Sequence, residues 1–260
     1  MVKFDVVTFG SGVIDTFALT DVGEVDVVSK KSRGKKKKAN KRLDLEIGSK
    51  YLIDKLRFDV GGGGTNCAVA FSRFGLKTGC ICGVGNDANG RMVLDCLKNE
   101  GIEFLGIVGK GNTGYSVIVD SKKHNRTVLT YKGESNNVGI GDVRYFTSNW
   151  LYYSSLLGKS FEAQKRLAKK FVKGGGRLAF NPSSYAIEKQ DIKGMLKITH
   201  VLILNKEEAV SLANRYDGKW EIGDGKSMGS LLRELRGLGP EIVVVTDKDK
   251  EAFAFDGKQE

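Results

Sequence analysis

The chain has 260 residues, of which 40% are hydrophobic and 28% charged, with a formal net charge of +11. This composition is typical of a soluble globular protein with a sizeable core. It excludes a membrane span, because no window approaches eighteen uninterrupted apolar residues. The first residues, MVKFDVVTFG, lead directly into a strand pattern without the layout of a signal peptide, so we expect a cytoplasmic protein.

The chain from Phe4 begins with a predicted strand, FDVVTFGS, followed by an irregular stretch that carries a basic run. This run, KKSRGKKKKANKR from Lys30 to Arg42, has nine basic residues and no acidic one, so the rest of the chain is nearly neutral. Its composition favours a solvated loop. An arm that attracts RNA or phosphates is the alternative.

Four consecutive glycines at 61–64 come next and precede a predicted helix that ends at Gly75. Glycine loses more conformational entropy on folding than any other residue, so such a run is costly unless the backbone passes close to something. A ligand is the interpretation we favour. Further along, TGCICGVG predicts a strand and GRMVLDCLKNEG a helix, while GYSVIVDS and RTVLTYK flank KKHN and predict a hairpin.

The second half of the chain repeats one pattern. The strands WLYYSS, RLAFN, HVLILN and EIVVVTD are separated by helical patterns at 160–173, 188–198, 206–216 and 227–238. Such alternation predicts an α/β fold with a parallel sheet covered by helices on both faces. The segments 16–60 and 107–136 are β-rich exceptions, and we expect them to form a second, smaller sheet.

The four cysteines lie inside apolar patterns and lack the spacing of a zinc site, so we expect buried, reduced thiols at Cys67, Cys80, Cys82 and Cys96. Three glycine-rich sequences approach nucleotide-binding motifs without completing them. GSGVID at 10–15 has Asp15 where the dinucleotide fingerprint has its third glycine, and GVGNDA at 83–88 comes well after the first strand. GKS at 158–160 lacks the first glycine of a P-loop.

Five segments taken together resemble the ribokinase-like, or PfkB-type, carbohydrate kinases. They are GSGVID at 10–15, GGGGTNCA at 61–68, GNDANG at 85–90, TGYSVI at 113–118 and LNKEEA at 204–209. The resemblance runs from Val6 to Asp256. It implies a three-layer αβα sandwich with a core from residues 1–15, 61–106 and 137–260, and a small β lid from 16–60 and 107–136 that includes the basic loop 30–42.

The resemblance implies phosphoryl transfer from ATP, with Mg²⁺, to a hydroxyl of a sugar or nucleoside. It also implies that two copies can pair through their lids as a homodimer. For the substrate it assigns Asp15, Gly62, Gly63 and Asn66. Asp15 follows the first strand and would accept from two hydroxyls, the glycines would bring backbone N–H groups close, and Asn66 would add an amide. The alternatives are a turn residue for Asp15 and a helix cap for Asn66.

For the nucleotide the resemblance assigns Asn205 and Glu208, which would organise the water shell of Mg²⁺ around the ATP phosphates, with Glu208 acting through water. The alternative for this pair is a helix cap and a favourable acid in the first turn. Asn181, after RLAFN, would line the same site. Thr246 and Asp247 end EIVVVTD, where the resemblance puts further nucleotide contacts.

Two departures from the family pattern concern the nucleotide and the chemistry. After Thr246 the family has two glycines, whereas this chain has Lys248 and Glu251. The chain stops at Glu260, before the Gly-Ala-Gly-Asp segment that supplies the family's anion hole and catalytic base. We therefore assign no catalytic residue in these 260 residues, expect an incomplete core with exposed apolar surface, and expect binding without turnover. The alternative function is a non-catalytic sugar- or nucleoside-binding protein whose basic arm holds an acidic partner such as RNA.

Overall fold

The computed structural model describes residues 3–28, 39–123, 125–216, 219–220, 227–248 and 250–258. They divide into two compact units. The first comprises Met1–Val13, Val60–Gly114 and Lys132–Glu260, and the second Ile14–Asp59 and Tyr115–Tyr131. Among the described residues, no helix is both long and apolar enough to cross a membrane.

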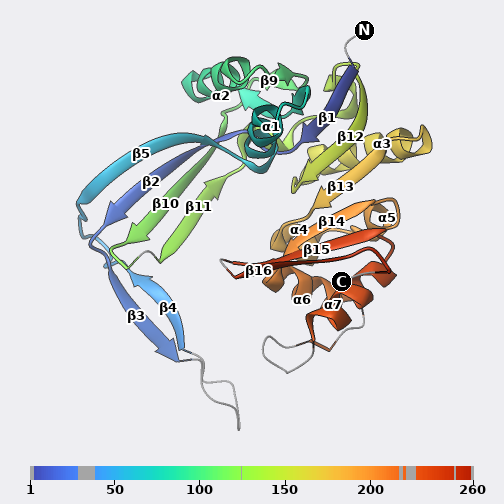
Figure 1. The fold of residues 1–260 in the computed structure, drawn as a ribbon. Helices are drawn as coiled ribbons and strands as arrows, with labels where there is room; N and C mark the ends of the chain where they lie inside the picture. The colour runs from blue at the N-terminus through green and yellow to red at the C-terminus, as the bar shows by residue number, and fades with distance from the viewer. Residues whose placement is uncertain are drawn as a thin grey trace. The chain divides into compact units, whose positions relative to one another are not determined.

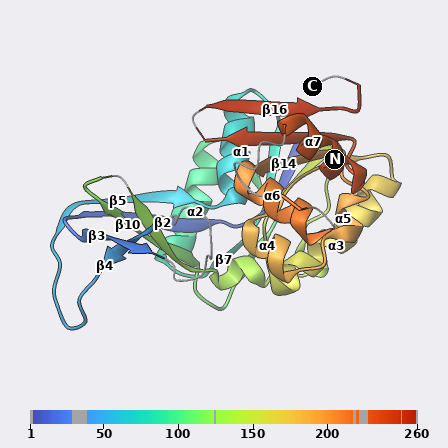
Figure 2. The same ribbon diagram turned by 90° about the horizontal axis from the view of Figure 1, so that it is seen from below.

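The first unit is built on an eight-stranded sheet (Figure 1). Its order is β16 (Glu251–Phe255), β15 (Ile242–Asp247), β14 (Val201–Asn205), β13 (Arg177–Asn181), β12 (Thr147–Ser154), β1 (Lys3–Phe9), β6 (Thr78–Ile81) and β8 (Glu103–Phe104). Neighbouring strands are parallel from β15 to β8, which confirms the predicted parallel sheet. The exception is β16, which runs antiparallel to β15 at the edge, as Figure 2 shows.

Helices pack on both faces of this sheet. They are α1 (Gly63–Arg73), α2 (Ala88–Asn99), α3 (Gly158–Lys173), α4 (Ser184–Lys189), α5 (Lys193–Leu196), α6 (Lys206–Arg215) and α7 (Met228–Gly237). Successive residues of β12 point to opposite faces, as the geometry of a strand requires. Tyr152 makes an edge contact with Phe71 of α1, while Tyr153 belongs to the core that also contains Phe161 of α3. The sheet therefore has a helical layer on each side.

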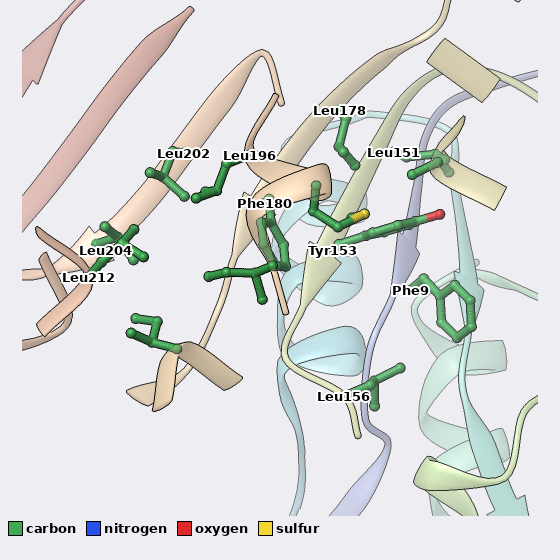
Figure 3. Packing of buried hydrophobic residues seen from close by; sticks show 14 of the residues in the cluster. Phe9, Leu151, Tyr153, Leu156, Leu178, Phe180, Leu196, Leu202, Leu204 and Leu212 are labelled. Atoms are coloured by element: carbon green, nitrogen blue, oxygen red, sulfur yellow. The ribbon is translucent and has the colours of Figure 1, made fainter. Parts of the chain in front are cut away.

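The core lies between the sheet and the layer that contains α3, α6 and α7. Leucines and aromatic residues from adjacent strands interdigitate there, and Phe9 meets Tyr153 edge-on with ring centroids 5.6 Å apart (Figure 3). Gln164 of α3 is fully buried, and its Nε2 donates to the carbonyls of Phe9 and Ser154 at 2.7 and 2.9 Å. Because these two residues end β1 and β12, the contact fixes the carboxyl edge of the sheet.

The helix predicted at 188–198 is wrong, because the chain forms two shorter helices there, α4 and α5. Asp191 lies between them, and its carboxylate accepts from the backbone N–H of Lys193 at 3.1 Å. Such a local side-chain bond competes with helix propagation and favours a turn. The helices predicted at 160–173, 206–216 and 227–238 are confirmed to within two residues as α3, α6 and α7.

The second unit contains a four-stranded sheet with the order β11 (Arg126–Tyr131), β10 (Gly114–Ser121), β2 (Val13–Thr20) and β5 (Ile53–Gly61). It also contains an antiparallel pair, β3 (Gly23–Val28) and β4 (Ala39–Asp44). The strands β10 and β11 form the predicted hairpin. The basic run is described only from residue 39 onward, so residues 30–38 of the predicted loop lie outside the described residues.

Residues 107–114 and 132–136, expected in the small sheet, lie in the first unit. There, β9 (Ile107–Gly109) pairs with β7 (Gly83–Gly85), next to the large sheet. Glu134 is buried in a 3₁₀ turn (Gly133–Asn136), and its carboxylate accepts from the N–H of Gly111 at 2.7 Å. These contacts attach both segments to the larger unit.

Candidate functional site

Three polar residues lie at the ends of neighbouring parallel strands. Asn181 ends β13, Asn205 ends β14, and Thr246 is the penultimate residue of β15. Asn205 and Thr246 are register partners, and the Asn181 amide donates to the carbonyl of Ile203 on β14 at 2.8 Å. The structure thus brings these predicted residues together on one edge. In open α/β sheets the carboxyl edge is where ligands bind.

Asn205 and Glu208 form a reciprocal capping box at the start of α6. Asn205 Oδ1 accepts from the N–H of Glu208 at 2.8 Å, and Glu208 Oε2 accepts from the N–H of Asn205 at 3.1 Å. The capping alternative is therefore realised. The box occupies Oε2 of the Glu208 carboxylate, and the backbone N–H of Ser184 also bonds to this carboxyl.

Burial raises the pKa of the Glu208 carboxyl, although backbone N–H groups of Asn205 and Ser184 act in the opposite direction. A half-buried carboxylate at a helix N-terminus is suited to a cation or to water bound to one. Asn205 and Glu208 thus form an oxygen-rich donor set that fits the outer shell of Mg²⁺, which retains several of its waters.

Asp247, expected to contact a nucleotide, forms an ion pair with Lys206. The Lys206 Nζ lies 2.6 Å from Asp247 Oδ2, and the hydrogen bond from this lysine lowers the pKa of the carboxyl. Next to it, Lys248 Nζ lies 3.6 Å from Glu207 Oε1. Lys206 was not predicted from the sequence, where its only distinguishing feature is its position directly after Asn205.

Lys248 is the one non-glycine residue among those described with a positive φ, at 55°. This left-handed backbone favours glycine. The turn therefore has the backbone conformation of a glycine turn but carries a lysine side chain, at a position where the resemblance places glycine.

The glycine run packs against the end of β1. Gly62 caps α1 with φ 102°, and a Cβ on Gly64 would lie 2.7 Å from the carbonyl carbon of Gly10. The N–H of Gly63 donates to Ser11 Oγ at 3.2 Å and that of Gly64 to Ser11 O at 3.0 Å. Close internal packing is thus one reason for these glycines. Ligand contact at Gly62 and Gly63 stays a prediction.

Asn66 is exposed within the first turn of α1. Because Gly62 is the capping residue, the alternative of a cap at Asn66 is wrong. An exposed amide near a helix N-terminus is available to a polar ligand, and substrate binding by Asn66 stays a prediction.

Asp15 belongs to the second unit. It was expected at the end of the first strand, but β1 ends at Phe9 and Asp15 lies within β2, so the turn alternative is also wrong. Its side chain is half-buried and shares a strand face with Phe17, over whose ring Arg57 stacks at 4.5 Å.

Asp87, in GNDANG, has a structural role. Its carboxylate caps α2 through the N–H of Gly90 at 2.7 Å, and it accepts from the N–H and hydroxyl of Thr113 at 2.8 and 2.6 Å. The carboxylate therefore joins two of the five segments, GNDANG and TGYSVI.

Comparison with known families identifies the chain. Residues 40–260 match the model of the pfkB family carbohydrate kinases. The chain belongs to this family. Among curated PfkB-type relatives, it is 26% identical over 151 residues to an uncharacterized sugar kinase of Archaeoglobus fulgidus, covering 54% of this chain and 58% of the relative. It is 24% identical over 201 residues to a ribokinase of Haemophilus influenzae, covering 74% of this chain and 62% of the relative.

Solved structures agree with the family fold. Adenosine kinase from Sinorhizobium meliloti superposes with a TM-score of 0.74 at 16% identity, over 99% of this chain and 79% of that one. The fold is therefore ribokinase-like, as the sequence predicted. The matches to the two curated relatives span less than two thirds of the relatives' own length.

Proposed function

We propose that this PfkB-family protein phosphorylates a hydroxyl of a sugar or nucleoside with ATP and Mg²⁺. The observation that carries the proposal is the set of Asn181, Asn205, Glu208 and Thr246 on one carboxyl edge. A triphosphate with its metal needs polar groups and a helix N-terminus at such an edge. The family supports the activity, and the relatives named as ribokinase and adenosine kinase support both substrate classes.

Each residue has a proposed role. Asn205 and Glu208 would hold the waters of Mg²⁺, and that ion would neutralise charge on the transferring phosphoryl group. Asn181 and Thr246 would orient the nucleotide from adjacent strand ends. Gly62, Gly63 and Asn66 at the start of α1, and Asp15 in β2, would bind substrate hydroxyls, because a carboxylate and an amide complement groups that both donate and accept.

A second candidate function is binding without turnover. It is favoured by Lys248 and Glu251, which stand where the family pattern has glycines that let a nucleotide approach the backbone. ADP release separates the two candidates, measured with ATP and Mg²⁺ over a panel of pentoses, hexoses and nucleosides, alongside calorimetric binding of the same compounds. Turnover, by these 260 residues or by the same chain extended with the family's Gly-Ala-Gly-Asp segment, supports the kinase; binding of a sugar without ADP release by both forms supports the second candidate. No binding by any compound contradicts both.

Glu208→Gln tests the metal role. The raised pKa of Glu208 means that its carboxylate form is lost, as pH falls, at a pH above the ordinary glutamate value of about 4.3. Mg²⁺-dependent ATP affinity should show this acid limb in the wild type and lose it in Glu208→Gln, with weaker binding at neutral pH. Glu188→Gln, an exposed change on α4, is the control. An unchanged acid limb in Glu208→Gln contradicts the role.

A further inference from the structure

Two consecutive ion pairs connect the start of α6 with the turn after β15. Lys206 pairs with Asp247 at 2.6 Å, and Glu207 pairs with Lys248 at 3.6 Å. The first pair is the more enclosed, with side chains 31% and 15% exposed, against 73% and 50% for Lys248 and Glu207. A short, enclosed pair depends less on solvent screening than an exposed one. The Lys206–Asp247 pair is therefore the stronger connection.

Asp247 is adjacent to Thr246, which shares the edge with Asn205. An ATP molecule bound there brings several negative charges to the same edge as the Asp247 carboxylate. Like charges brought together in a partly desolvated site disfavour binding. Lys206, the first residue of α6, forms the ion pair with Asp247 and acts on its carboxyl more strongly than Lys248 and Lys250 do.

We propose that Lys206 is a positioning residue for the phosphate donor: by pairing with Asp247 it cancels a carboxylate that would otherwise repel the donor's phosphates, and it holds the β15–β16 turn against α6. This inference rests on the proposed function, because it requires an anionic donor at this edge. It goes beyond that function by naming Lys206 as the residue that allows a carboxylate to lie at the edge where the phosphates bind.

The experiment measures the dissociation constant of ATP–Mg²⁺ by calorimetry for the wild type, Lys206→Met, Asp247→Asn and the double variant. Lys206→Met leaves the carboxylate unpaired, and we expect about tenfold weaker binding. The double variant removes both charges and should return to within about threefold of the wild type. Asp247→Asn alone should bind at least as tightly as the wild type, because it removes only the repelling group.

The dependence of ATP–Mg²⁺ affinity on salt distinguishes a charge effect of Lys206 from a purely structural role. Repulsion from an uncompensated Asp247 is screened at high ionic strength, so the defect of Lys206→Met relative to the wild type should shrink as salt is added. Lys250→Met removes a lysine from the same turn that has no ion pair among the described residues and acts on the Asp247 carboxyl less strongly than Lys206 does. This control should change affinity by less than about threefold.

The outcomes distinguish the inference from the function on which it rests. Rescue in the double variant together with a salt-sensitive defect supports the inference. A Lys206→Met variant that binds like the wild type overturns it, and so does a folded double variant that stays as weak as Lys206→Met. A folded wild type that binds no ATP overturns the proposed function and the inference with it. Thermal melting of each variant identifies any that fail to fold.

Discussion

Gly10 and Gly64 bring two backbones into direct contact beneath the carboxyl edge. A Cβ on Gly10 would lie 2.6 Å from the amide nitrogen of Gly64 and would also meet the hydroxyl of Ser154. Backbone atoms cannot withdraw as a flexible side chain can, so a methyl group there must displace β1 or α1. Gly10 is therefore needed for packing irrespective of any ligand.

Gly10→Ala should lower the free energy of unfolding by about 2 kcal/mol or more, because it overpacks this contact. The matched control is Gly194→Ala in α5, where a Cβ meets nothing within 4 Å. Alanine is the better helix former, so this control should be neutral or stabilising by about 0.5 kcal/mol. Urea denaturation measures both. A Gly10→Ala protein as stable as the wild type contradicts the packing argument.

Individual site residues differ in how far the sequence predicts them. Asn205 and Thr246 lie at the ends of recognisable apolar strands and Glu208 follows one, so their place at one edge was predictable, and the structure has them there. Their role in binding stays a prediction. The Lys206–Asp247 pair was not predictable, because it depends on which strand lies beside β14 and on the rotamer of a long side chain. Asp15 was misplaced by one strand, since the break between β1 and β2 occupies only residues 10–12.

At the scale of elements, Asp87 holds α2 against the chain that leads into β10. Three hydrogen bonds converge on its carboxylate from Gly90 and Thr113. Partial burial acts to raise the pKa of Asp87, but the bonds from Thr113 and Gly90 outweigh it, and the pKa is lowered. A carboxyl with a lowered pKa stabilises the folded state above its ordinary pKa, and this contribution is lost as pH falls through the lowered value.

Asp87→Asn should cost about 1–3 kcal/mol near neutral pH, because charge-assisted bonds become neutral ones or are lost. The difference from the wild type should be constant above about pH 5 and shrink at lower pH, as the wild-type carboxylate becomes protonated. Asp95→Asn, an exposed change on the same helix, is the control and should follow the wild type throughout. A difference that does not depend on pH would count against the carboxylate's role. Denaturation at a series of pH values measures it.

Regular elements were predictable where their periodicity extends over several residues, as in β12 to β15 and α3, α6 and α7. Short elements were not predictable from periodicity. A two-residue strand such as β8 has no period to detect, and α4 and α5 are separated by a turn that depends on the side chain of Asp191. The small sheet was predicted as β-rich, but its membership follows from long-range pairing, which local patterns do not encode.

At the scale of the whole molecule, each sheet joins distant parts of the sequence. In the large sheet β1 lies between β6 and β12, and Lys3 pairs with Thr147. In the small sheet β2 lies between β10 and β5. Closing such long loops precedes the contacts that stabilise them, so folding is expected to be slow compared with that of a helical bundle.

The central place of β1 also bears on biosynthesis. β1 is translated well before β12, so one of its two edges has no partner until Thr147–Ser154 has been translated. Until then a buried, apolar strand has an open edge, which is prone to pairing with another chain. Ribosome-bound chains arrested before Thr147 should leave β1 sensitive to protease, and chains that extend well past Ser154 should protect it. Full protection in the shorter chains would show that β6 alone is enough to secure the strand. The interval between translation of Phe9 and translation of Thr147 is therefore the period in which we expect β1 to be open to pairing with another chain.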